Sequence, residues 1–257
     1  MLELGSETLI VTHDMMAQGT HFRARADMAD VAWKLVAVNL SDLAAKGAEP
    51  LGVLLGYSLG EGDARFVKGL GEALAAFNVP LLGGDTVRAA GARSFGLTAI
   101  GRATHIPVPD RRMARPGETV WVTRTLGRAM LGFEGQQEHA LAFNRPMPLL
   151  AEGKALAPHV GAMMDVSDGL LLDCWRMASA SGVTLALDSM AVPVADPARR
   201  AECLRWGDDY ELLFTLPAGI ASLVPAAPIG SVLPRGNCTM ILDDVNVASP
   251  DGLGYRH

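Results

Sequence analysis

Acidic side chains occur along this sequence at places where a strand or a helix is predicted to end. They are Asp14, Asp42, Asp85, Asp165 and Asp168. Each belongs to a separate segment, except that the last two share the segment MMDVSDGLLL (163–172). In α/β folds, side chains at the ends of strands and helices gather into sites. These acids are therefore the first candidates for chemistry.

Carboxylates that converge on one site need cations between them. Two carboxylates at ~4 Å repel by roughly 4 kcal/mol at an effective dielectric constant of about 20. Their segments contain no clustered His or Cys, and oxygen ligands alone select Mg²⁺ or Ca²⁺. Mg²⁺ held by a few carboxylates, with water and phosphate completing its shell, is the usual arrangement around nucleotides. The pattern therefore indicates phosphoryl transfer.

Each candidate also has a purely structural explanation. Asp42 could lie on a solvated helix face, and GGD at 83–85 could be a tight turn. His21, a single histidine in a predicted loop, could be a packing residue. Ser167 or Asp168 could cap a helix, but a cap uses only one of the two acids in its segment. The joint occurrence of the acids favours a site.

The segment VNLSDLAAKGAEP (38–50) is predicted to complete the helix that positions Asp42. Asp27 and Asp30 can cap the start of this helix, and Gly47 followed by Pro50 stops it. Its apolar stripe comprises Trp33, Val36, Ala37, Leu40, Leu43 and Ala44. The polar residues of its last two turns are Asn39, Ser41, Asp42 and Lys46.

Further elements are predicted on both sides of a proline-rich connection. Before it lie strands at 8–12, 51–59 and 95–104 and an amphipathic helix at 63–77. In the segment 79–88, an apolar run ends in GGD (83–85), which puts Asp85 at a strand end. The connection contains Arg111, Arg112 and Arg115 and is interpreted as the passage between two domains, 1–112 and 113–257. After it, strands are predicted at 118–123 and 183–187, a turn that leads into a strand at 206–216, and a short helix or turn at 126–133. No element is assigned to 133–148.

A second acidic segment is predicted to join a strand to a helix. Asp165 ends the strand, and the helix that follows Asp168 has a buried face. That face comprises Leu170, Leu171, Cys174 and Met177.

Composition limits the classes of protein to which the chain can belong. Its 257 residues include 28 Gly, 15 Pro and 5% aromatic residues, which is typical of a turn-rich α/β protein. A net charge of −6 and a pI near 5.5 argue against sequence-independent nucleic-acid binding. The three cysteines are far apart, and the sequence contains neither a signal peptide nor an apolar run long enough to span a membrane. We expect a cytoplasmic protein without nucleic-acid or membrane partners.

Several common catalytic motifs are absent from the sequence. No GKS or GKT marks a Walker-type nucleotide site, and no HRD or DFG marks a protein kinase. HExxH and a glycine-rich dinucleotide fingerprint do not occur. Phosphoryl transfer by this chain must therefore use a less common scaffold.

Five motifs, taken together, resemble a known family. THDMMAQGTHF, VNLSDLAAKGAEP, LLGGDTVR, MDVSDGL and WGDDYELLF follow the order and approximate spacing of the thiamine-monophosphate kinase family, which is related to aminoimidazole ribonucleotide synthetase. The resemblance implies a two-domain α/β (α+β) fold with ATP in the cleft between the domains. It implies an N-terminal ATP- and Mg²⁺-binding domain whose sheet is shared across a homodimer. The reaction would convert ATP and thiamine monophosphate to ADP and thiamine diphosphate.

The resemblance also implies roles for individual residues. Several Mg²⁺ ions would be held by Thr12, Asp14, Asp42, Asp85, Asp165 and Asp168. ATP would contact Gly84, Asp85, Arg111 and Ser167. Thiamine monophosphate would contact His21, Asp208 and Tyr255. No catalytic side chain is assigned, because no Ser, His or Cys in the motifs has a base beside it in sequence, and we expect direct in-line transfer.

The sequence departs from the family pattern in several places. The family has a Gly-Asp-Asp strand before the segment that matches residues 2–8, and we expect the native protein to extend upstream to include it. His13 stands where Thr is usual, Asp208 stands where Glu is usual, and the region 127–148 is shorter than expected.

Two alternatives stay open. One is another ATP-binding member of the superfamily, such as an ATP-dependent cyclising enzyme of purine synthesis or a hydrogenase-maturation factor. The other is a non-catalytic nucleotide-binding protein that lacks the first metal-binding strand.

Overall fold

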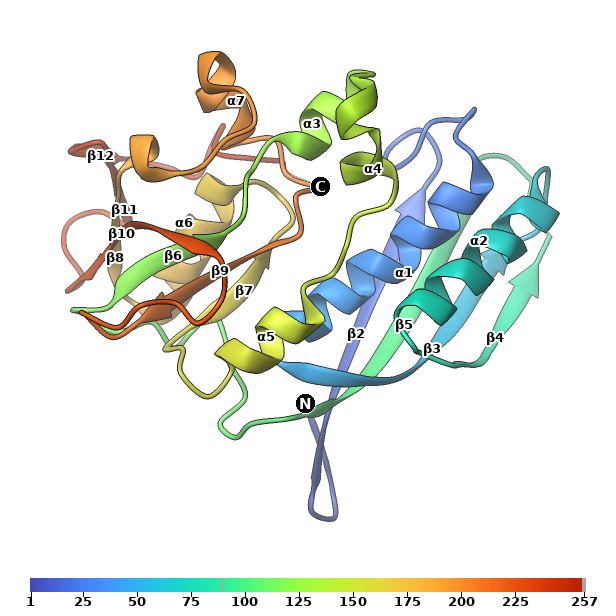
Figure 1. Cartoon of the computed structure of the whole chain (residues 1–257), viewed down its shortest axis with the longest axis horizontal. Helices are drawn as coiled ribbons and strands as arrows, with labels where there is room; N and C mark the ends of the chain where they lie inside the picture. The colour runs from blue at the N-terminus through green and yellow to red at the C-terminus, as the bar shows by residue number, and fades with distance from the viewer. Residues whose placement is uncertain (89, 256–257) are drawn as a thin grey trace.

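The computed structural model describes residues 1–88 and 90–255 and contains two β-sheets (Figure 1). The first sheet has the strand order β1-β2-β5-β3-β4. Its strands are β1 (Leu2–Leu4), β2 (Glu7–Ala17), β3 (Ala48–Ser58), β4 (Leu81–Val87) and β5 (Ser94–Ala103). Neighbouring strands are antiparallel except for β3 and β4, which are parallel and are joined by a helix.

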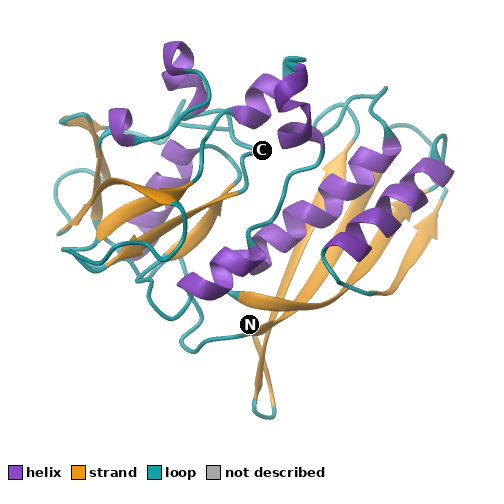
Figure 2. Ribbon diagram, in the orientation of Figure 1, coloured by secondary structure: helices purple, strands orange, loops and turns teal. Residues whose placement is uncertain are grey.

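Helices α1 (Met28–Ala44) and α2 (Asp63–Ala76) cover one face of this sheet (Figures 1 and 2). The predicted start of α1 is confirmed, because Asp27 accepts a 2.9 Å hydrogen bond from the backbone N–H of Ala29. The chain leaves the helix before Gly47, whose φ of +58° favours glycine. Asn39 and Ser41 are fully buried, so the polar side of α1 is an interior surface rather than a solvated one.

The other face of the first sheet, called the outer face below, carries exposed apolar side chains. On β2, Val11 is 44% exposed and Met15 57% exposed, whereas their neighbours Ile10 and Met16 point to the opposite face and are buried under the helices. On β3, Leu54 is 39% exposed. Every residue of β4 is exposed. The outer face is therefore apolar and accessible.

Two acids predicted at strand ends lie inside longer strands. β2 continues three residues past Asp14 to Ala17 because it pairs with β5 along that length. Asp85 lies inside β4, where it is opposite Gly56 of β3. The predicted strand ends at Asp14 and Asp85 are therefore wrong. Ladder hydrogen bonds use backbone groups, so polar side chains and glycines did not end either strand.

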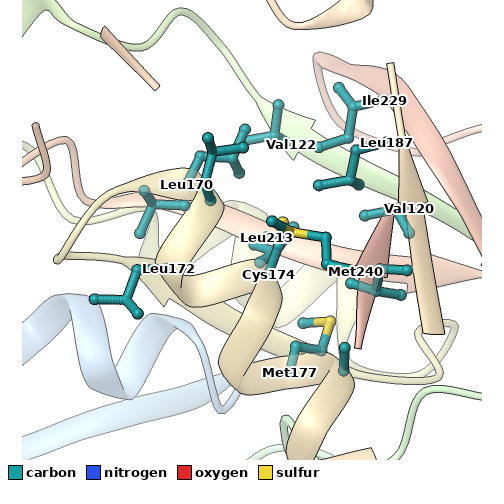
Figure 3. Close-up of a cluster of buried hydrophobic side chains, with 14 of the residues drawn as sticks. Val120, Val122, Leu170, Leu172, Cys174, Met177, Leu187, Leu213, Ile229 and Met240 are labelled. Atoms are coloured by element: carbon teal, nitrogen blue, oxygen red, sulfur yellow. The ribbon is translucent and has the colours of Figure 1, made fainter. Parts of the chain in front are cut away.

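The second sheet has the strand order β12-β11-β8-β10-β6-β9-β7. Its strands are β6 (Thr119–Thr123), β7 (Met163–Val166), β8 (Thr184–Leu187), β9 (Glu211–Leu216), β10 (Ala226–Leu233), β11 (Met240–Leu242) and β12 (Val245–Val247). Only β8 and β11 pair in parallel. Helix α6 (Leu170–Ser181) packs on this sheet, and its predicted buried face is confirmed: Leu170, Cys174 and Met177 contact the sheet's inward side chains (Figure 3).

Short helices between β6 and β7 lie on the side of the molecule that carries α1 (Figure 1). They are α3 (Arg128–Phe133), η1 (Gln137–His139), α4 (Ala140–Asn144) and α5 (Leu150–Leu156). Further short helices, η2 (Ser189–Ala191), η3 (Pro197–Arg199) and α7 (Arg200–Cys203), follow β8. The region 133–148, for which no element was predicted, thus contains η1 and α4. The proposed domain boundary at 112/113 falls in the connection between β5 and β6.

Helix α1 is the element that both domains share. Gly153 of α5 approaches the backbone of α1 so closely that a Cβ atom would lie 1.9 Å from the carbonyl oxygen of Ala44. Ala44 and Ala45 belong to the same apolar cluster as Leu212 and Phe214 of β9. The last turn of α1 is therefore packed between the two sheets. In the described ranges, no helix is long and apolar enough to cross a membrane.

Candidate active site

A cavity of about 500 Å³ lies between the two domains, with α1 and β2 on one side and loops of the second domain on the other. We call it the interdomain cavity. Residues predicted for the site line it from six separate segments of the chain. They are Asp14, His21, Asp42, Asp165, Ser167, Asp168, Asp208 and Tyr255.

Asp14, Asp42 and Asp165 form the acidic end of the interdomain cavity. They come from β2, α1 and β7, and the charges of the first two act on the third. The hydroxyl of Thr12 donates a hydrogen bond to Asp42. The hydroxyl of Ser41 donates a 2.7 Å bond to Asp165. Each of these two acids is thus held by a hydroxyl from the first domain.

Burial and mutual repulsion disfavour the ionised forms of the carboxylates at the acidic end. Burial raises the pKa of Asp165 well above its usual range, and the negative charges of Asp42 and other acids raise it further. Burial also raises the pKa of Asp42, although the hydrogen bond from Thr12 and the charges of Lys46 and Arg111 oppose this. A cation between these carboxylates would favour their ionised forms.

The donor set at this end consists of carboxylate and hydroxyl oxygens, which suit Mg²⁺. Across 1–88 and 90–255, no three His, Cys, Asp or Glu side chains are grouped closely enough to enclose a metal ion by themselves. Mg²⁺ usually takes one or two protein carboxylates and completes its shell with water and phosphate. The site therefore fits a cation that arrives with a nucleotide.

Ser167 and Asp168 form a loop in which every backbone polar group has a partner. One oxygen of the buried Asp173 carboxylate accepts the N–H groups of both residues at 3.1 Å. The carbonyl oxygen of Ser167 accepts the N–H of Asp208 at 2.8 Å, and that of Asp168 accepts the N–H of Tyr255 at 2.9 Å. The backbone thus couples predicted nucleotide and metal ligands to two predicted substrate residues.

The predicted capping role of Ser167 or Asp168 is wrong. The N-cap of α6 is Gly169, and no side chain caps that helix. Gly169 has a φ of +105°, and a Cβ atom there would lie 2.6 Å from the carbonyl oxygen of Arg205. Asp168 instead pairs with Arg176 of α6, which also contacts Asp173 at 2.9 Å. Asp165 and Asp168 therefore both line the interdomain cavity, and neither caps α6.

The opposite end of the interdomain cavity is basic and aromatic. Lys34 of α1 donates a 2.8 Å hydrogen bond to Asp208, and its ammonium lies 3.9 Å from the centre of the Phe143 ring. Asp208 also accepts a 2.8 Å bond from the hydroxyl of Tyr210. Nδ1 of His21 accepts the N–H of Ala17, so the neutral imidazole carries its proton on Nε2.

Four of the predicted ligands, Thr12, Gly84, Asp85 and Arg111, do not line the interdomain cavity. Gly84 and Asp85 lie on β4 at the far edge of the first sheet, and Asp85 faces the outer side, as Gly56 does. Arg111 is exposed in the connection between domains, within electrostatic reach of Asp42. Thr12 stands behind Asp42 as its hydrogen-bond donor.

His13 also faces away from the acids. It alternates with Asp14 along β2 and hydrogen-bonds Thr98 of β5 at 2.8 Å on the outer face.

Lys34, Ser41 and Asp173 are site residues that sequence reasoning did not select. A signal for Lys34 existed, because it precedes Asp42 by eight residues, and residues at this spacing lie on one helix face. Asp173 is an acid among buried positions of an apolar helix, which is unusual without a partner. Ser41 could not be distinguished from a polar surface residue, because its partner Asp165 is 124 positions away.

The chain is similar to known proteins along most of its length. Residues 1–103 match the family model described as AIR synthase related protein, N-terminal domain. Residues 115–229 match the corresponding C-terminal domain. The thiamine-monophosphate kinase of Caulobacter vibrioides is 36% identical over 97% of this chain and 80% of that protein.

Two solved structures are similar along nearly the whole chain. That of thiamine-monophosphate kinase from Stenotrophomonas maltophilia has a TM-score of 0.85 and 31% identity, covering 95% of this chain and 87% of that one. AaThiL complexed with AMPPCP and TMP has a TM-score of 0.87 and 26% identity, covering 96% and 87%. By sequence and fold, the chain belongs to the thiamine-monophosphate kinase family, within the AIR synthase related proteins.

Proposed function

We propose that the protein transfers the γ-phosphoryl group of ATP to thiamine monophosphate, giving ADP and thiamine diphosphate. The observation that carries this proposal is the polarity of the interdomain cavity. Its acidic end suits nucleotide phosphates with their cations, and its basic, aromatic end suits a phosphorylated ring compound. A related structure holds an ATP analogue together with TMP.

Mg²⁺ fits the acidic end on the chemistry of its donors. Asp14, Asp42 and Asp165 would hold the ions from two domains, and Asp168 would join them from the loop. When bound, Mg²⁺ neutralises the phosphate charges and stabilises the charge that develops on the transferring group. The chain itself fixes the acids through Thr12 and the other hydroxyl and backbone donors described above.

Transfer is proposed to be direct. Cys174 and Cys203 are buried, and no cysteine lines the interdomain cavity in the described part of the chain. Phosphoryl transfer needs chiefly positioning and charge neutralisation, so it requires no covalent intermediate on the protein. Recovery of labelled protein after incubation with γ-labelled ATP and a denaturing quench would contradict this step.

The functional unit is proposed to be a homodimer joined through the outer face. Val11, Met15 and Leu54 form an exposed apolar surface that a second copy would bury. Two strands separate β2 from β4, which places Asp85 roughly 14 Å from the Asp14 strand at about 4.8 Å a strand. Asp85 also faces the other side of the sheet, so it would serve a nucleotide only across the dimer.

One assay tests the proposed reaction. Purified protein with ATP, Mg²⁺ and thiamine monophosphate should form ADP and thiamine diphosphate in equal amounts. Omitting thiamine monophosphate should abolish ADP formation. Hydrolysis of ATP without thiamine diphosphate, or ATP binding without turnover, would overturn the proposal. The three free cysteines suit a reducing cytoplasm, where we place the reaction.

A further inference from the structure

A second cavity of about 460 Å³ adjoins the interdomain cavity and shares part of its wall. His21, Arg23 and Lys34 line both cavities. Because shared residues lie between the two spaces, these three form a basic boundary. The acids Asp14 and Asp42 line only the interdomain cavity. A molecule extending from one cavity into the other would pass this boundary.

The second cavity is suited to an uncharged or aromatic group. Phe22, Phe133 and Phe143 are part of its wall. Its two acids are already paired, Asp27 with Arg65 and Asp30 with Arg145. The acids of the second cavity are therefore neutralised, while ring faces are available for stacking.

Lys34 is the most deeply buried cation of the boundary. It is 4% exposed, and within the described residues its ammonium donates one hydrogen bond, to Asp208. An ammonium carries three donors, so two are left for a ligand. A buried ammonium without a counter-ion is costly, and Asp208 supplies that counter-ion in the ligand-free protein.

Asp208 is held independently of Lys34. Its other carboxylate oxygen accepts the hydroxyl of Tyr210 at 2.8 Å, and its N–H is bonded to the carbonyl oxygen of Ser167. Asp208 would therefore keep its place if the ammonium turned towards another anion. The ammonium can turn because it ends a flexible four-carbon chain.

We infer that Lys34 binds the phosphate of the acceptor at this boundary, exchanging Asp208 for the phosphate dianion, while the acceptor's rings occupy the second cavity. This inference rests on the proposed function and names a residue that determines its specificity. The phosphate then lies between the basic boundary and the acidic end, where the nucleotide is proposed to bind. Lys34 thereby selects a phosphorylated acceptor over the same compound without phosphate.

The test compares binding of thiamine monophosphate and of thiamine, by calorimetry, in the presence of Mg²⁺ and the ATP analogue AMPPCP. Lys34→Gln should weaken thiamine monophosphate binding roughly tenfold or more, because it removes a charge-assisted hydrogen bond. Thiamine binding should change less than about twofold, since thiamine has no phosphate to lose a partner. Lys154→Gln, on the exposed side of α5, should change neither Kd.

A second pair of variants controls for the broken ion pair. Asp208→Asn and Lys34→Gln/Asp208→Asn both lack it and differ only in the lysine. We expect the preference for thiamine monophosphate over thiamine to persist in Asp208→Asn and to be lost in the double variant. Thermal melting shows whether each variant is folded.

Equal weakening of both ligands, or an unchanged preference in both lysine variants, would overturn the inference. A merely structural role of Lys34 would produce the first of these results. The proposed function fails separately, if the wild-type protein forms no thiamine diphosphate. In that case, a phosphate preference that depends on Lys34 would still establish the phosphate site.

Discussion

The hydroxyl of Ser41 donates a 2.7 Å hydrogen bond to the carboxylate of Asp165, joining α1 of the first domain to β7 of the second. Both side chains are buried. Asp42, the next residue of α1, lines the interdomain cavity. Consecutive residues of one helix thus bind the second domain and present an acid to the cavity, so the position of the acid is fixed relative to both domains.

We expect Asp42→Asn to lower kcat roughly 100-fold or more, because a bound cation contributes several kcal/mol to a phosphoryl-transfer transition state. With a chelator present to remove Mg²⁺, the variant should melt at the wild-type temperature or higher, because the substitution removes one of the mutually repelling negative charges of the acidic end. Turnover at saturating Mg²⁺ and thermal melting are the measurements. Asp244→Asn, at an exposed position, is the matched control. Wild-type turnover in Asp42→Asn would show that this acid does not hold a cation needed for transfer.

Local signals explain why the helices were predictable. The capping carboxylate of Asp27, the apolar period of α1 and the glycine at Gly47 all lie within one stretch of sequence. Strand lengths were less predictable, because β2 extends to Ala17 through its pairing with β5, whose residues are 77 to 93 positions away from their partners. The face on which Asp85 lies also depends on the pairing of β4 with β3, and the face on which His13 lies depends on the pairing of β2 with β5.

The region 133–148 is stabilised by distant contacts, which explains why its helices were not predicted. Arg145 pairs with Asp30 at 2.5 Å and with Glu72 at 2.9 Å. The indole N–H of Trp33 donates a 3.0 Å bond to the carbonyl oxygen of Pro146. The motifs identified most cavity residues by type, whereas Lys34 and Asp173 became visible only through their partners.

If Asp85 acts across the dimer, two inactive variants should complement each other. Asp42→Asn and Asp85→Asn, mixed in equal amounts and allowed to exchange subunits, should recover about a quarter of wild-type activity, because half of the dimers are mixed and each has one intact site. Each variant alone should be inactive. Mixing that recovers no activity, with subunit exchange verified by mass spectrometry, would show that a single subunit supplies both acids of a site.

Glu211 should make stability fall as pH rises. Burial raises its pKa from 4.5 to about 7, although the hydrogen bond from Thr123 opposes the shift. Between these values the folded state binds more protons than the unfolded state, so stability is lost as pH rises through this window. Glu211→Gln should therefore be more stable than wild type at pH 8, by on the order of 3 kcal/mol, and nearly equal to it below about pH 4.5.

Urea denaturation of both proteins across this pH range measures the effect. The amide oxygen of Gln can still accept the hydroxyl of Thr123, so the comparison isolates the charge. A stability difference that does not depend on pH would show that Glu211 ionises normally in the folded protein.

Asp173 should act as a positioning residue for the loop that presents Ser167 and Asp168. Asp173→Ala leaves the two N–H groups of that loop without their acceptor, at a cost of roughly 1–3 kcal/mol each. The displaced loop should bind cations less well, so we expect kcat to fall and the Mg²⁺ concentration for half-maximal activity to rise, each roughly tenfold. Asp173→Asn keeps an oxygen for these N–H groups and should restore most of the Mg²⁺ dependence.

A general loss of stability would not produce that pattern. Asp188 provides the control, because it also accepts a backbone N–H, from Met190 at 2.8 Å, but lies outside both cavities. Asp188→Ala should lower the melting temperature without changing the Mg²⁺ requirement. If folded Asp173→Ala keeps the wild-type Mg²⁺ requirement, the carboxylate stabilises α6 but does not position the loop. If both values shift and Asn restores them, a buried acid that touches no substrate sets the geometry of the site.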